Sequence, residues 1–162
     1  MTASVLPTPM RTRRLVAGLG HVDRGDDGFG PAVVRTLRES GRSPARLVDC
    51  PEGPSALLDL WEGVTISWIV DAVVSGAAPG TLHVRDARTE PIPRELGAPS
   101  SHGLALRDVV DLAGSLGRLP QRLTILGVEA SSFSLGDPMS PAVRAQVRPV
   151  AERILEEATK DA

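Results

Sequence analysis

The sequence predicts one α/β domain, a three-layer sandwich in which a mainly parallel, twisted sheet of about five strands carries helices on both faces. Short runs rich in β-branched residues alternate with longer segments of helical periodicity, a pattern typical of layered α/β folds. The 16 glycines and 14 prolines lie between these segments and do not gather into a linker. The length of 162 residues suits a single domain spanning 1–162, of which 1–12 is expected to be flexible.

Five segments have the composition of strands. The third is an almost continuous apolar run, typical of a strand buried on both faces, and one acid, Asp71, interrupts it. The fourth alternates polar and apolar residues, so we expect it to be half exposed and to form a hairpin with the third. The predicted strands are 14–20, 45–50, 66–74, 81–86 and 122–128.

Two helices are predicted in the first half of the chain. Pro31 favours the first turn of one helix, since its missing N–H is not needed there. Val33 and Leu37 follow at helical spacing and form the apolar face of that helix. A short second helix contains Leu57 and Trp61.

Two further helices are predicted in the second half. Residues 87–99 contain three prolines and are interpreted as a long ordered loop. Ser100 or Ser101 is then expected to cap a helix, because a serine hydroxyl accepts from the free N–H groups of a first turn. A final helix starts at Ser140, and Pro149 inside it should kink it or split it in two.

Composition excludes several classes of protein. The formal net charge of −2 argues against a nucleic-acid partner, which would need a strongly basic face. No apolar run approaches the roughly 20 residues of a membrane helix, and no secretory signal is evident, so we expect no membrane association and a cytoplasmic location. A single cysteine, Cys50, permits no internal disulfide and suits a reducing compartment. We expect a monomer.

Three acidic or imidazole-bearing segments are predicted to meet at one edge of the sheet. Ligands of open α/β sheets bind outside the carboxyl ends of the strands. Asp26 and Asp27 follow the first strand, Asp71 lies near the end of the third, and His102 precedes a helix. Asp27, Asp71 and His102 would form a reasonable ligand set for a divalent transition metal, because imidazole suits zinc or nickel and carboxylates complete the shell.

Each of these residues also has a simpler interpretation. Asp27 could cap the helix that follows it, and His102 could cap its own helix or face solvent. Asp71 is harder to explain in this way, since an unpaired buried acid costs several kcal/mol. His83 alternates with apolar neighbours and is interpreted as an exposed strand residue, whereas His21 stays open.

Other chemistries are less well supported. The loop GLGHVDRGDDGFG begins like a dinucleotide-binding turn, but Asp23 stands where the third glycine belongs, and acids before the helix would repel a pyrophosphate. Cys50 is interpreted as a buried, inert thiol. Neither a G-x-S-x-G serine elbow nor an H-E-x-x-H metalloprotease helix is present.

Taken together in order and spacing, these segments resemble the maturation endopeptidases of nickel–iron hydrogenases. Those enzymes remove a C-terminal extension from the precursor of the hydrogenase large subunit. The resemblance extends from about residue 13 to about residue 157. The segments that carry it are GLGHVDRGDDGFG at 18–30, VDAVVSGAAPGTLHVRD at 70–86, SSHGLALRDVV at 100–110, LGRLPQRLTILGVEA at 116–130 and LGDPMSPAVRAQV at 135–147.

The resemblance implies that Asp27, Asp71 and His102 are metal ligands, and that the nickel is carried by the precursor and is not a resident cofactor. It leaves open whether the metal serves for recognition or for hydrolysis. If it serves recognition alone, Asp26 or Asp49 could act as the hydrolytic base. His21 replaces the usual asparagine of the first loop, and Cys50–Pro51 alters the usual D-G-G turn after Asp49.

Two other functions are weighed against this one. A non-catalytic metal-sensing or chaperone-like binding protein could use the same fold and the same ligands. A nucleotide-binding, flavodoxin-like domain is the other, and the acidic glycine loop opposes it.

Overall fold

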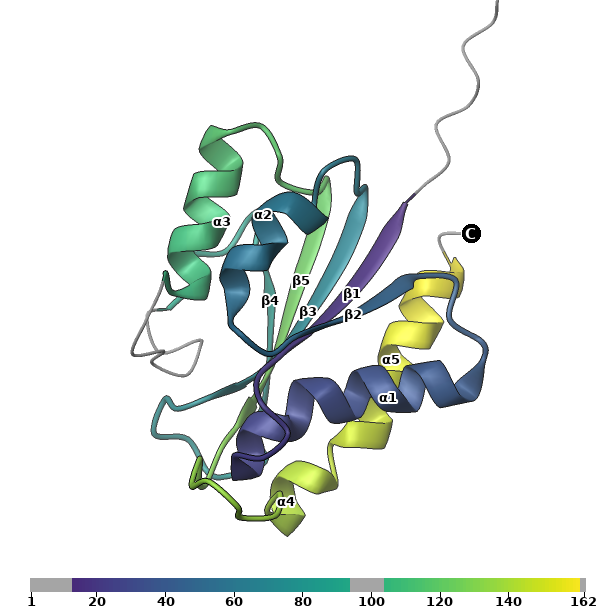
Figure 1. The fold of residues 1–162 in the computed structure, drawn as a ribbon. Coiled ribbons are helices and arrows are strands. Elements are labelled where there is room, and N and C mark those ends of the chain that lie inside the picture. The colour runs from purple at the N-terminus through teal and green to yellow at the C-terminus, as the bar shows by residue number, and fades with distance from the viewer. Residues whose placement is uncertain (1–12, 94–103, 161–162) are drawn as a thin grey trace, which may run out of the picture.

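The computed structural model describes residues 13–93 and 104–160 (Figure 1). The expected flexible segment 1–12 and His102 lie outside these ranges. A five-stranded sheet has the order β2-β1-β3-β5-β4. Its strands are β1 (Arg14–Leu19), β2 (Arg46–Cys50), β3 (Ile66–Val73), β4 (Leu82–Asp86) and β5 (Arg122–Glu129).

Four strands are parallel, and β4 alone runs antiparallel, at the edge beside β5. The predicted hairpin between the third and fourth strands is therefore wrong. Both sides of β3 are already occupied, by β1 on one side and β5 on the other, so the chain after β3 must cross over the end of β5 before it can pair. The predicted mainly parallel sheet with helices on both faces is confirmed.

The helices form two outer layers (Figure 1). On one face lie α1 (Phe29–Ser40) and α5 (Val147–Lys160), and on the other lie α2 (Leu57–Leu60) and α3 (Leu106–Ser115). Alternate strand residues supply the two cores, as the strand period of two requires. Val70 and Leu126 pack with the α1 and α5 side, whereas Ile69 and Ile125 pack with the α2 and α3 side.

Two helix boundaries differ from the expectations. The helix α3 begins at Leu106, so the predicted cap at Ser100 or Ser101 is wrong; the backbone N–H of Ala105 instead donates to the Asp108 carboxylate at 3.1 Å. The last helix is split as predicted, into α4 (Pro141–Arg144) and α5. The break precedes Pro149, which lies in the first turn of α5, where a missing N–H costs little.

Close packing of α1 against β1 sets the position of the loop between them. A side chain at Gly18 would overlap the carbonyl of Gly30, and one at Gly30 would overlap the backbone of Leu19. Only glycines allow this approach, which holds the short 3₁₀ helix η1 (Gly25–Gly28) over the carboxyl edge of the sheet. A second 3₁₀ turn, η2 (Pro54–Ala56), leads into α2. No helix within 13–93 and 104–160 is both long and apolar enough to span a bilayer.

Candidate active site at the carboxyl edge of the sheet

Asp27 lies in η1 and turns back toward the end of β1. Its Oδ2 accepts the backbone N–H of His21 at 2.8 Å, and no side-chain hydrogen bond caps α1. The interpretation of Asp27 as the helix cap is therefore wrong. Gly20, at φ +115°, passes so close to Asp27 that a side chain there would overlap the backbone of Asp27. The loop is thus folded around the Asp27 carboxylate.

Asp71 lies near the end of β3 and is only 5% exposed. Its Oδ1 accepts the backbone N–H of Ala72 at 2.8 Å. Burial raises the pKa of Asp71 to about 7; the Ala72 hydrogen bond opposes this shift and the negative charge of Asp27 adds to it. Asp27 therefore lies close enough to Asp71 for its charge to act on it, and the role of the two acids as metal ligands stays a prediction.

A paired set of carboxylates suits a cation. Ionising both acids at a buried edge is unfavourable, and a bound cation would relieve the repulsion. Carboxylate oxygens are ordinary ligands of divalent metals. The third predicted ligand, His102, lies outside the described residues. In the part of the chain that the structure describes, no group of three histidines, cysteines or acids forms a metal site.

Asp26, the neighbour of Asp27, has an entirely different environment. It is 1% exposed, and its carboxylate accepts the backbone N–H groups of Ser131, Ser132 and Ser140, at 2.7 to 3.1 Å, and the Ser140 hydroxyl. Burial alone would raise the pKa of Asp26, but these hydrogen bonds outweigh burial and lower it. This is the environment of an acid that joins segments, since it accepts from residues on both sides of the loop after β5 and little of it is open to water.

Asp49, the other candidate base, is more accessible. It is next to the last residue of β2, its side chain is 43% exposed, and its Oδ2 lies 3.7 Å from an Arg38 nitrogen. It also lines a cavity of about 310 Å³, together with Gly20, His21 and Pro51. This cavity adjoins the Asp27 loop, because the N–H of His21 donates to Asp27. Asp49 therefore has both solvent access and a hollow beside it.

Cys50 is buried, whereas His21 in the loop after β1 is partly exposed. Burial, and secondarily the charge of Asp49, raise the pKa of the Cys50 thiol to about 11, so the predicted inert thiol agrees with its surroundings. The ring of His21 is about half exposed, and its Nδ1 lies 3.8 Å from Asp23.

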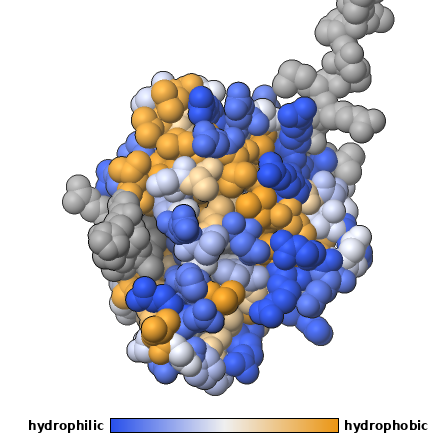
Figure 2. All heavy atoms as spheres, viewed as in Figure 1, coloured by the Kyte–Doolittle hydropathy of each residue, from blue (hydrophilic) through white to orange (hydrophobic). Residues whose placement is uncertain are grey.

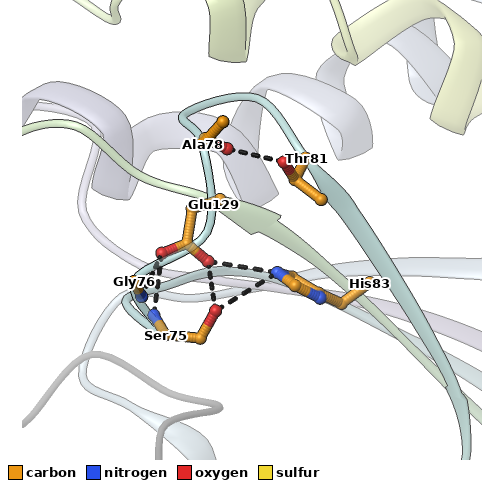
Figure 3. Close-up of polar contacts among 6 residues, drawn as sticks. All are labelled: Ser75, Gly76, Ala78, Thr81, His83 and Glu129. Atoms are coloured by element: carbon orange, nitrogen blue, oxygen red, sulfur yellow. Dashed lines mark hydrogen bonds and ion pairs between the residues drawn. The ribbon is translucent and has the colours of Figure 1, made fainter.

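Sequence reasoning missed a third buried acid, Glu129, at the end of β5 (Figure 3). Its carboxylate accepts the backbone N–H groups of Ser75 and Gly76, the Ser75 hydroxyl at 2.7 Å, and His83 Nε2 at 3.1 Å. The His83 side chain is only 23% exposed, so its interpretation as a simply exposed strand residue is wrong. An acid closing the apolar run ILGVE was the available signal.

The Ser75, His83 and Glu129 cluster is not a hydrolytic triad. In such triads the acid binds one imidazole nitrogen and the serine binds the other. Here Ser75 Oγ, at 3.5 Å, and Glu129 both contact Nε2 of His83, and the serine hydroxyl donates to the glutamate itself. Burial would raise the pKa of Glu129, but its hydrogen bonds outweigh burial and lower it. The cluster therefore anchors the chain after β3.

Comparison with known proteins gives concordant results. The family model for hydrogenase maturation protease matches residues 31–157, a range that includes Asp71 and His102 and begins after Asp27. The hydrogenase expression/formation protein HoxM of Azotobacter vinelandii is 33% identical over 147 residues, which cover 88% of this chain and 70% of HoxM. The hydrogenase 2 maturation protease of Escherichia coli is 30% identical, over 88% of each chain.

Solved structures agree with the fold. The hydrogenase maturating endopeptidase HybD from Escherichia coli superposes with a TM-score of 0.78 at 26% identity, over 93% of this chain and 94% of HybD. The [NiFe] hydrogenase maturation protease HycI from Thermococcus kodakarensis KOD1 gives a TM-score of 0.72 at 27% identity, over 90% and 91% of the two chains.

Proposed function

This chain belongs to the hydrogenase maturation protease family, and from that membership we propose that it removes the C-terminal extension from the large-subunit precursor of a nickel–iron hydrogenase after nickel insertion. It is an endopeptidase of hydrogenase maturation, as the family and the endopeptidase structures indicate. The alternative of a non-catalytic binding protein is not favoured by these relatives, and neither is a nucleotide-binding domain.

The observation that carries the proposal is the Asp27–Asp71 pair. One carboxylate comes from the loop after β1 and the other from the end of β3, and the charge of Asp27 raises the pKa of Asp71 at the edge where parallel α/β sheets bind ligands. We propose that these two acids, with His102, bind the nickel that the precursor brings. Such a site would bind the nickel-loaded precursor more tightly than the empty one. The three side chains can coordinate the nickel of a loaded precursor, whereas an empty precursor offers them no metal.

The residues of the chain have separate parts in this reaction. Asp27 and Asp71 hold the loaded precursor at the sheet edge, where a divalent ion would also polarise a peptide carbonyl. Asp49 is the better candidate for the hydrolytic base, since it is half exposed beside a cavity, whereas Asp26 is occupied by hydrogen bonds. We further propose that the protein works as a monomer in the cytoplasm, where a free thiol such as Cys50 suits the reducing conditions.

The test is a mass measurement on the purified precursor, with and without nickel, before and after incubation with the protein. We expect loss of the extension only from the nickel-loaded precursor. Asp71→Ala and His102→Ala should abolish the loss, whereas Asp59→Ala, a change at an acid whose side chain is 94% exposed, should leave it unchanged. Trimming of the loaded precursor at the wild-type rate by both active-site variants would refute the assigned ligands.

A further inference from the structure

Three loops lie at the carboxyl edge of the sheet, where Asp27 and Asp71 also lie, and each presents a large apolar side chain to solvent. They follow β1, β3 and β5, the three central strands of the sheet. Val22 is 61% exposed, Val74 49% and Leu135 78%. We refer to these three side chains as the apolar rim. The other exposed large apolar residues among those the structure describes are Leu104, just before α3, and Leu112 and Leu116 at α3.

The loops are joined to one another by backbone hydrogen bonds. Gly136 N–H donates to the Asp23 carbonyl at 2.7 Å, and Gly25 N–H donates to the Asp137 carbonyl at 3.1 Å, so the loops of Val22 and Leu135 run together. Ala130 N–H donates to the Val73 carbonyl at 2.8 Å, which joins the exit of β3 to the third loop. The apolar rim therefore stands on one connected band of backbone.

Each loop is also fixed from beneath by a carboxylate. Asp27 accepts from His21 in the first loop, and Asp26 accepts from Ser131 and Ser132 in the third. In the second loop Glu129 accepts from Ser75 and Gly76, directly after Val74 (Figure 3). These hydrogen bonds restrain the backbone of each loop before any partner arrives.

A hollow lies between the first and third loops. It has a volume of about 380 Å³, and its lining is mixed: Val22, Pro138 and Met139 are apolar, whereas Arg35, Asp137 and Arg144 are charged. Figure 2 shows apolar side chains among polar ones at the lower left of the molecule, where Figure 1 places the loops after β3 and β5. Ordered apolar side chains beside a pocket are the usual features of an interface centre.

We propose that Val22, Val74 and Leu135 form a preorganised docking surface for the body of the hydrogenase precursor. The inference rests on the proposed function. The position of the apolar rim identifies the precursor as the molecule that binds it, because a polypeptide that reaches Asp27 and Asp71 must pass over the loops beside them. Fixed loops reduce the ordering cost of association, so a few apolar contacts suffice to hold the precursor while its extension is cut.

The test uses steady-state cleavage of the nickel-loaded precursor by Val22→Ser, Val74→Ser and Leu135→Ser. We expect each change to raise KM about fivefold with kcat unchanged, since each removes one apolar contact made equally in ground and transition states. The triple variant should raise KM roughly a hundredfold if the contacts are independent. Leu116→Ser is the matched control: this side chain is 54% exposed but follows α3, near the opposite edge of the sheet, and should leave both constants unchanged.

A docking role and a loss of folding give different kinetics. A variant that merely unfolds lowers the concentration of active enzyme, so the apparent kcat falls and KM stays the same. The inference would be overturned by that result, and equally by a wild-type KM in all three single variants. If the rim instead joined two copies of this chain, sedimentation of the wild-type protein would show a dimer that the triple variant lacks, which also overturns it. Failure of the proposed function is distinct, because the wild-type protein itself would then leave the precursor uncut.

Discussion

Asp26 and Asp27 are adjacent in the chain, yet their side chains have different roles. The 3₁₀ turn points them in different directions: Asp26 faces the serines after β5, whereas Asp27 faces the end of β1 and its charge acts on Asp71. The surroundings of each carboxylate, and not its residue type, therefore determine whether it joins loops or forms a site. This difference leads to two predictions about single residues.

Replacing Asp71 with asparagine should change how stability depends on pH. The folded-state pKa of about 7 lies above the ordinary aspartate value of 3.8, so the folded protein binds this proton more tightly than the unfolded chain. The contribution of Asp71 to the free energy of unfolding is therefore fully present below about pH 4. It is lost as pH rises to about 7, at up to about 1.4 kcal/mol per pH unit.

Urea unfolding of the metal-free protein between pH 4 and pH 8 measures this effect. The difference in unfolding free energy between wild type and Asp71→Asn should change by a few kcal/mol across that range, in the sense that favours the variant at higher pH. A difference that stays constant with pH would mean that Asp71 is not a desolvated acid.

Replacing Asp26 with asparagine should destabilise the protein without touching the chemistry. Asparagine keeps only one acceptor oxygen, so its amide nitrogen must face either the N–H groups of Ser131 and Ser132 or the N–H of Ser140, and it cannot accept from them. The expected cost is about 2–4 kcal/mol. The Asp26→Asn variant should unfold at lower urea concentration but keep the wild-type kcat per folded molecule at saturating precursor, because Asp26 is not assigned to the cleavage step. Loss of cleavage in a fully folded variant would instead support Asp26 as the hydrolytic base.

At the scale of elements, the connection between β3 and β4 depends on one side chain. This connection passes over the end of β5, where Glu129 lies. Glu129 accepts hydrogen bonds from both ends of the connection: from Ser75 and Gly76 after β3, and from His83 in β4 (Figure 3). The backbone of Glu129 is also bonded to Gly80 and Thr81. The crossover is thus held where the sheet order requires it.

Glu129→Ala should loosen this connection, whereas Glu129→Gln should largely preserve it. Alanine removes the acceptor that the N–H groups of Ser75 and Gly76 share, but a glutamine oxygen can still accept from both. Amide hydrogen exchange at these two residues should speed up by at least about tenfold in the alanine variant and change little in the glutamine variant. Unchanged protection in Glu129→Ala would show that other contacts hold the connection.

At the scale of the whole molecule, the proposed metal ligands come from three distant parts of the chain. Asp27 follows β1, Asp71 lies near the end of β3, and His102 precedes α3. An unfolded chain cannot bring them together, so any cation bound by the set must stabilise the folded state by mass action.

Nickel ions should therefore raise the melting temperature of the wild-type protein. The proposed set predicts a shift that grows with nickel concentration and is strongly reduced in Asp27→Ala, Asp71→Ala and His102→Ala. Asp59→Ala is the control, since Asp59 is an acid in α2 whose side chain is 94% exposed. Equal shifts in all four variants and wild type would mean that nickel binds elsewhere.

Periodicity and composition were enough to predict most of the fold. The five predicted strands each match an observed strand to within about one residue at either end, because buried β-branched runs and turn residues are local signals. The position of β4 was not predictable in this way. Strand order depends on which edges of β3 are free, and no pattern within 81–86 reports that.

For the candidate site, too, some features could be predicted from the sequence and others could not. The residues alone determined that Asp71 needs a partner, since an acid within an apolar strand is costly to bury, and motif order determined the family. Only the tertiary structure decided that the charge of Asp27 acts on Asp71 while Asp26 turns away, and that Glu129 and His83 anchor the chain after β3. The physical reason is that the hydrophobic pattern around a residue indicates whether it is buried. Which side chains interact depends on how separate strands and loops approach each other, and no local sequence pattern encodes that approach.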